Sequence, residues 1–60
     1  MDTKYIVESR EISEEKWTPK GTFRYLEEAR EYVYDRLKIY FGFDYRIRKI
    51  YSGGEYFYDR

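Results

Sequence analysis

Hydrophobic and polar positions along this 60-residue chain follow two periods, one typical of a helix and one typical of strands. From residue 26 onward the apolar side chains recur at the spacing of one helical stripe. The stripe consists of Leu26, Ala29, Val33, Leu37, Tyr40 and Phe41, and the charged residues opposite to it are Glu27, Glu28, Glu31, Asp35 and Lys38. The pattern predicts an amphipathic helix that ends before Gly42, a glycine placed as a C-terminal cap. Its start, near Leu26, is fixed only to within one turn, because the nearest conventional N-cap residue is Thr22.

The segment before the helix predicts one clear strand and one short strand. Residues 4–11 combine Tyr, Ile and Val with a rough polar–apolar alternation, which is typical of a strand. Residues 16–18 predict a second, short strand that stops at Pro19, because proline cannot donate a hydrogen bond to a sheet. Gly21 then permits a bend towards the helix. The pattern does not determine which face of the first strand points to the core, since Tyr5 and Val7 point to one side and Ile6 to the other.

The segment after the helix predicts a hairpin. Residues 43–51 alternate with a period of two, which places rings on one face of a strand and cations on the other. Residues 52–55 contain adjacent glycines, Gly53 and Gly54, which we expect to supply the positive φ values of a tight turn. Residues 56–58 form the returning strand. The fold class is therefore α+β, a single small domain over residues 1–60. We expect a three- to four-stranded antiparallel sheet with one helix on one face, in the order β-(β)-α-β-β.

The composition is unusual in its content of aromatic rings. Nine Tyr, four Phe and one Trp make up 23% of the chain, whereas Ile, Leu and Val together fill nine positions. Protein cores consist mainly of aliphatic side chains, and a chain of this size buries only a modest share of its surface. We therefore expect several rings on the surface, where Tyr is typical of interfaces and of base-stacking platforms. The formal net charge of zero argues against binding to nucleic acid or to an anionic membrane by bulk electrostatics.

Several classes of function find little support in the residue types present. The chain has no His and no Cys, so the usual general base near neutral pH, the strongest nucleophile and the transition-metal ligands are all missing. An acid–base pair of carboxylates is conceivable, but we expect a solvated acidic edge at Glu8, Glu11, Glu14 and Glu15. We therefore expect no enzyme, no metal and no cofactor. No signal peptide and no membrane-spanning run are evident, which favours a cytoplasmic protein.

Two groups of rings and cations are candidates for a protein-binding surface. One lies beside the helical stripe and comprises Tyr25, Tyr32, Arg36 and Ile39; the other belongs to the final hairpin and comprises Arg46, Arg48, Tyr56 and Tyr58. Tyr and Arg next to an apolar residue are typical of binding hot spots. The chain is therefore interpreted as a non-enzymatic protein–protein interaction module, with part of the surface used for dimerisation. Packing of these rings over sheet edges within one molecule is the other reading.

Binding of nucleic acid or of a nucleotide is the alternative hypothesis. Cations at Arg46, Arg48 and Lys49, with Tyr residues on the same and the neighbouring strand, resemble sheets that stack bases beside a cationic groove. Acidic residues flank this basic run, however, at Asp44, Glu55 and Asp59. We therefore expect these residues to form an ordinary charge-matched pair of strands, because opposite charges across neighbouring strands commonly stabilise a sheet.

The order of short motifs resembles a class of very small proteins carried by bacteriophages and prophages. These motifs read YIVESRE, WTPxGTF, LEEARE and YRIRKIYSGGEYFY, and they span nearly the whole chain. The resemblance suggests core positions at Trp17, Phe23, Leu26, Ala29, Tyr45 and Ile47, and the chain departs from the pattern at Tyr25, where a Ser or Thr cap is expected. It implies an accessory phage protein, a type that often binds and blocks a host or defence protein, frequently as a homodimer. It implies no catalytic or ligand-binding residue.

Overall fold

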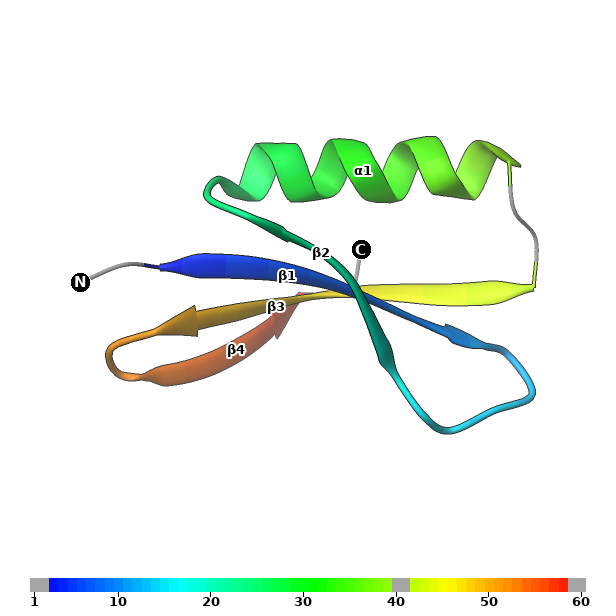
Figure 1. The fold of residues 1–60 in the computed structure, drawn as a ribbon, viewed down its shortest axis with the longest axis horizontal. Helices are drawn as coiled ribbons and strands as arrows, with labels where there is room; N and C mark the ends of the chain where they lie inside the picture. Colours follow the sequence, from blue (N-terminus) through cyan, green and yellow to red (C-terminus); the bar gives the residue numbers. More distant parts are fainter. Residues whose placement is uncertain (1–2, 40–41, 59–60) are drawn as a thin grey trace.

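The structure of the protein is a computed structural model, which describes residues 3–39 and 42–58 (Figure 1). Its elements are β1 (Lys4–Glu11), β2 (Thr18–Phe23), α1 (Leu26–Ile39), β3 (Phe43–Tyr51) and β4 (Gly54–Tyr58). The strands form one antiparallel sheet in the order β2-β1-β3-β4. The predicted α+β class and the order β-β-α-β-β are confirmed, with four strands in the sheet.

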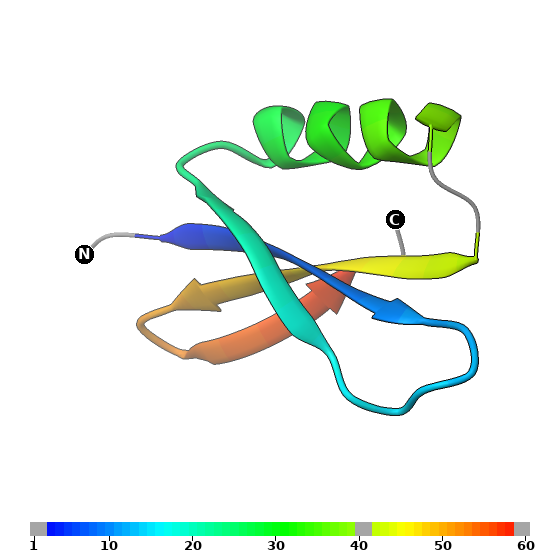
Figure 2. The ribbon, with the colours of Figure 1, turned by 45° about the vertical axis from the view of Figure 1, so that its right-hand side comes forward.

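Helix α1 covers one face of this sheet (Figures 1 and 2). It lies over β1, β2 and β3. The buried core lies between the helix and the two central strands and consists of Val7, Ala29, Val33, Tyr45 and Ile47. Tyr5 packs against this core, so the inward face of β1 is the one that carries Tyr5 and Val7, and Ile6 lies on the opposite face.

Strand β2 differs from its prediction. The strand begins at Thr18, where it was expected to end, and continues through Pro19 and Gly21 to Phe23. Because β2 is an edge strand, the missing N–H of Pro19 can face outward without loss of a hydrogen bond within the sheet. The pairing with β1 also contains an irregularity, since Val7 pairs with Gly21 and the next residue, Glu8, pairs with Pro19. Lys20 is thus the extra residue of a β-bulge.

The ends of α1 and the turn of the hairpin agree with the sequence pattern in most respects. The helix begins at Leu26, as predicted, and the backbone N–H of Ala29 donates to the carbonyl of Tyr25 at 3.3 Å. Tyr40 and Phe41, the last predicted stripe positions, lie outside the described residues; Gly42 has a φ of 84°, as expected of a cap glycine. In the β3–β4 turn only Gly54 has a positive φ, 136°, so the expectation for Gly53 was wrong.

The distribution of rings confirms that several lie on the surface. Of the twelve aromatic residues in the described ranges, one is buried, six are half-buried and five are exposed. The exposed rings are Tyr25, Tyr34, Tyr51, Tyr56 and Phe57. Of the six positions that the resemblance assigned to the core, Trp17 is the one that does not belong to it. It lies in the connection between β1 and β2, half-buried, away from the helix.

Candidate functional site

The face of the sheet opposite α1 is called here the open face, because no helix or strand of the described chain covers it (Figures 1 and 2). The pair Val7 and Ile47 points to the helix, so the next pair, Glu8 and Arg46, points to the open face. The same alternation assigns to this face Ile6 and Arg10 of β1, Asp44 and Arg48 of β3, and Glu55 and Phe57 of β4.

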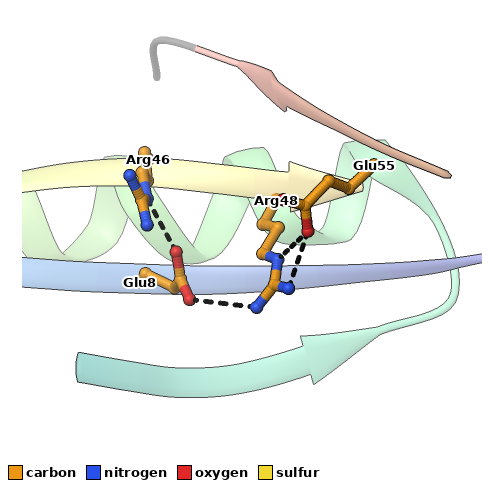
Figure 3. Close-up of polar contacts among 4 residues, drawn as sticks. All are labelled: Glu8, Arg46, Arg48 and Glu55. Atoms are coloured by element: carbon orange, nitrogen blue, oxygen red, sulfur yellow. Dashed lines mark hydrogen bonds and ion pairs between the residues drawn. The ribbon is translucent and has the colours of Figure 1, made fainter. Parts of the chain in front are cut away.

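A ladder of ion pairs crosses the open face from β1 to β4 (Figure 3). Arg46 Nε donates to Glu8 Oε1 at 2.7 Å, and Arg48 lies within 3.8 Å of Glu8 Oε2. On its other side, Arg48 Nε donates to Glu55 Oε2 at 2.8 Å. Each of these partners comes from a neighbouring strand, so the ladder ties three strands together. The prediction of a charge-matched pair of strands is confirmed here.

The burial of Glu8 corrects the expected acidic edge. Glu11, Glu14 and Glu15 are exposed as predicted, but Glu8 is only 6% exposed. The reason is its place on a central strand, opposite Arg46, where the two guanidinium groups satisfy its carboxylate. A carboxylate that is buried in this way is stable only when it is paired. Glu8 is therefore a structural member of the ladder.

A stack of rings and guanidinium groups lies beside the ladder. The guanidinium carbon of Arg46 lies 4.3 Å from the centre of the Trp17 ring and 4.4 Å from the centre of the Phe57 ring. Arg10 also lies over Trp17, at 4.8 Å, and its Nη2 is 3.4 Å from Asp44 Oδ2. These distances are within the range of cation–π interactions. The β1–β2 connection folds onto the open face in this way, which explains why Trp17 is absent from the core.

The hairpin residues that were predicted to form one exposed face do not share a face. Arg46 and Arg48 lie on the open face, and Arg48 pairs directly with Phe57. Tyr56 and Tyr58, which pair with Lys49 and Ile47, point to the other side of the sheet, where their ring centres are 4.8 Å apart. Because side chains alternate along a strand, Phe57 and not its two neighbours joins the arginines.

The helix residues that were predicted to bind form a third surface. Tyr25 and Ile39 are exposed, whereas Tyr32 packs against Phe23 of β2 with ring centres 5.5 Å apart. The guanidinium of Arg36 lies 4.8 Å from the centre of the Tyr32 ring. Tyr32 and Arg36 therefore lie on the β2 side of α1, and β2 and β4 are opposite edges of the sheet. The eight predicted residues thus occupy three separate surfaces.

The members of the open face that the sequence reasoning did not place there include Trp17, Phe57, Glu8 and Arg10. The position of Phe57 could have been deduced, because a turn at residues 52–53 brings it opposite Arg48. For Trp17 no local signal exists, since its partners Arg10 and Arg46 lie on two different strands.

The functional groups on the open face are aromatic rings and paired charged side chains. The described residues contain no group of three or more carboxylates close enough to hold a metal ion. No helix in the ranges 3–39 and 42–58 is long and apolar enough to cross a membrane. Comparison of the chain with protein-family models, with curated proteins and with solved structures found no match.

Proposed function

We propose that the chain is a non-enzymatic protein–protein interaction module and that the open face is its docking surface. The observation that carries this proposal is the stack of Trp17, Arg46 and Phe57 on the face that α1 leaves uncovered. Trp and Arg are the residue types that contribute most to protein interfaces, and aromatic rings are enriched there. Phe57 remains 43% exposed and offers an apolar contact at the edge of the stack.

The balance of charge on the open face favours a protein partner over nucleic acid. Among the described residues this face has three arginines, and each has a carboxylate partner: the pairs are Arg10 with Asp44, Arg46 with Glu8, and Arg48 with Glu55. A phosphate group would have to compete with these carboxylates for the same guanidinium groups. Side chains that are already held in place lose less freedom on binding, which favours association with a complementary protein surface.

The nature of the partner is suggested by the sequence resemblance. The resemblance to small phage and prophage proteins implies that the partner is a host or defence protein. Binding would block that protein and so inhibit it. A second copy of the chain is another partner that the proposal includes, because a dimer would extend a core that has five buried apolar residues in the ranges 3–39 and 42–58.

Affinity capture with matched variants tests the docking surface. Tagged wild-type chain is incubated with a cell extract, beside Phe57→Ala, which shortens an exposed ring of the open face, and Tyr34→Ala, which shortens an exposed ring on α1. Proteins that bind through the open face are retained by the wild type and by Tyr34→Ala and lost with Phe57→Ala. Circular dichroism verifies that both variants are folded. Equal retention by the two variants contradicts the proposal.

Two further measurements separate the partner classes. Binding to nucleic acid weakens steeply as salt rises and disappears after nuclease treatment, whereas an interface of rings and internally paired charges changes little. Light scattering over a dilution series measures self-association. If the chain is strictly monomeric at tens of micromolar, self-association is no longer part of the proposal, and only binding to a different protein remains.

A further inference from the structure

The two edge strands of the sheet differ in how well they are protected against pairing with a further strand. Strand β2 contains Pro19 and the bulge residue Lys20. Proline, lysine and bulges are devices by which proteins keep an edge strand from pairing with another chain. Strand β4 reads GEYFY, without proline or a basic residue, and it pairs with β3 in a regular register (Figures 1 and 2). The edge at β4 therefore lacks the protection that β2 has.

The register of the β3–β4 hairpin identifies the backbone groups of β4 that point outward. Tyr51 and Gly54 pair directly beside the two-residue turn, so they form a hydrogen-bonded pair. Hydrogen-bonded and non-hydrogen-bonded pairs alternate along an antiparallel ladder, so the pair that contains Tyr56 is hydrogen-bonded again. The N–H and C=O groups of Glu55 and Phe57 therefore point away from β3. Within residues 3–39 and 42–58, no strand lies on that side.

We propose that β4 pairs with β4 of a second copy of the chain, in an antiparallel arrangement with two-fold symmetry. The two sheets then form one continuous sheet. Tyr56 lies at the two-fold axis and faces Tyr56 of the other copy, while Glu55 of each copy pairs with Phe57 of the other. Because Glu55 and Phe57 carry the outward-pointing backbone groups, both of these pairs are hydrogen-bonded.

The side chains of β4 fit this register. Gly54 of one copy lies opposite Tyr58 of the other, and a glycine in a strand leaves room for a ring from the neighbouring strand. Tyr56 is 56% exposed and Phe57 is 43% exposed, so the added strand would cover rings that now face solvent. A register centred on Glu55 would instead place two carboxylates opposite each other, which destabilises a strand pair. The register centred on Tyr56 brings no like charges of β4 together.

The proposal does not rest on the docking function of the open face. Tyr56 pairs with Lys49 and points to the helix side of the sheet, whereas Phe57 points to the open face. Because Tyr56 faces its own copy across the axis, both sheets turn their helices to the same side. Both open faces then lie together on the other side and remain accessible.

The length of β4 limits the strength of the dimer. A strand of 5 residues buries less than the roughly 800 Å² per partner of a standard interface, which is typical of a weak association. We therefore expect a dissociation constant of roughly 10–100 µM.

Dilution of the unmodified chain tests whether β4 is the site of association. Light scattering between about 10 µM and about 1 mM should show a dimer that dissociates on dilution. In the ¹⁵N-labelled chain, the amides of Glu55 and Phe57 should shift with concentration, because their N–H groups gain an acceptor. The amides of Lys20 and Thr22 on β2 are the controls and should not shift. A chain that is monomeric throughout, or that shifts at β2 and not at β4, overturns the proposal.

Charge exchange at Tyr56 tests the two-fold register. Tyr56→Lys and Tyr56→Glu should each weaken dimerisation roughly tenfold, because like charges then face each other at the axis and the pair of rings is lost. An equimolar mixture of the two variants should associate more tightly than either alone, since opposite charges then meet. The controls Tyr34→Lys and Tyr34→Glu, at a position of α1 that is 64% exposed, should dimerise like the wild type.

Circular dichroism verifies that the variants fold, and if one does not, the amide shifts of the unmodified chain decide. The proposal is overturned if the folded Tyr56 variants dimerise like the wild type, or if their mixture associates no more tightly than each variant alone. The result is separate from that of the affinity capture. Tyr56→Glu should still retain proteins that bind through the open face, because Tyr56 lies on the other side of the sheet.

Discussion

The guanidinium carbon of Arg46 lies 4.3 Å from the centre of the Trp17 ring, although Trp17 belongs to the connection between β1 and β2 and not to the sheet. Arg46 at the same time donates a 2.7 Å hydrogen bond to Glu8 of β1. One side chain on a central strand therefore joins the connection to the sheet. Loss of the contact should affect both the stability of the chain and the shape of the open face.

A double-mutant cycle measures the contact between Trp17 and Arg46. We expect Trp17→Leu and Arg46→Met to be non-additive in urea unfolding, with a coupling free energy of about 1 kcal/mol, typical of a partly exposed cation–π pair. The cycle cancels the separate loss of the Arg46–Glu8 ion pair, which the Arg46→Met variant carries alone and in combination. The control cycle combines Trp17→Leu with Arg48→Met, since no cation–π contact joins those residues. Equal coupling energies in both cycles would contradict the assignment.

Glu8→Gln should lower the free energy of unfolding by about 1–3 kcal/mol, because it removes the carboxylate between two guanidinium groups and leaves them without their shared partner. The expected loss is below that of a fully buried pair, since the side chains of Arg46 and Arg48 are 27% and 36% exposed. Urea unfolding followed by circular dichroism gives the value. Glu31→Gln on the exposed side of α1 is the control and should change stability by less than about 0.5 kcal/mol. A Glu8→Gln variant as stable as this control would show that the ladder contributes nothing to folding.

Ile47→Ala should destabilise the chain more than any surface truncation. Ile47 is fully buried beside Val7 on the sheet face that points to the helix, and truncation of its side chain to that of Ala leaves a cavity that costs about 2–5 kcal/mol. Ile39→Ala makes the same chemical change at a position that is 65% exposed and should cost less than about 0.5 kcal/mol. Thermal unfolding of both variants provides the comparison. Similar midpoints for the two would mean that the core does not lie where the helix meets β3.

The elements that local patterns encode were predicted well, and the one that depends on its neighbours was not. Strand β1 has the predicted bounds, and α1 begins at the predicted residue, because helical and strand periods are visible within a few turns or alternations. The position of strand β2 was predicted wrongly, because a proline such as Pro19 is typical of the end of a strand. An edge strand can contain a proline, but whether β2 is an edge strand is a property of the complete sheet.

The same distinction holds for the open face. The cationic side of β3 followed from the alternation of Arg46 and Arg48 with the ring-bearing positions, but their shared partner Glu8 did not, because it lies on a different strand. The place of Trp17 could not follow, because its guanidinium neighbours come from strands 7 and 29 residues away in the chain. Rings that pack on charged groups carry no periodic signal, so tertiary contacts alone decide their position.

The turn between β3 and β4 offers a test of backbone conformation with a matched control one residue away. Gly54 has a φ of 136°, which residues with a Cβ rarely adopt, so Gly54→Ala should cost about 1–3 kcal/mol. Gly53 has no positive φ, but a Cβ there would lie 2.8 Å from Cε2 of the Tyr51 ring. Because that ring can rotate away, Gly53→Ala should cost less and should shift the Tyr51 ring resonances instead. In a chain of this size each kcal/mol lowers the melting temperature by roughly 4–8 °C, so thermal unfolding resolves the two variants. A larger loss for Gly53→Ala than for Gly54→Ala would reverse the assignment of the strained residue in the turn.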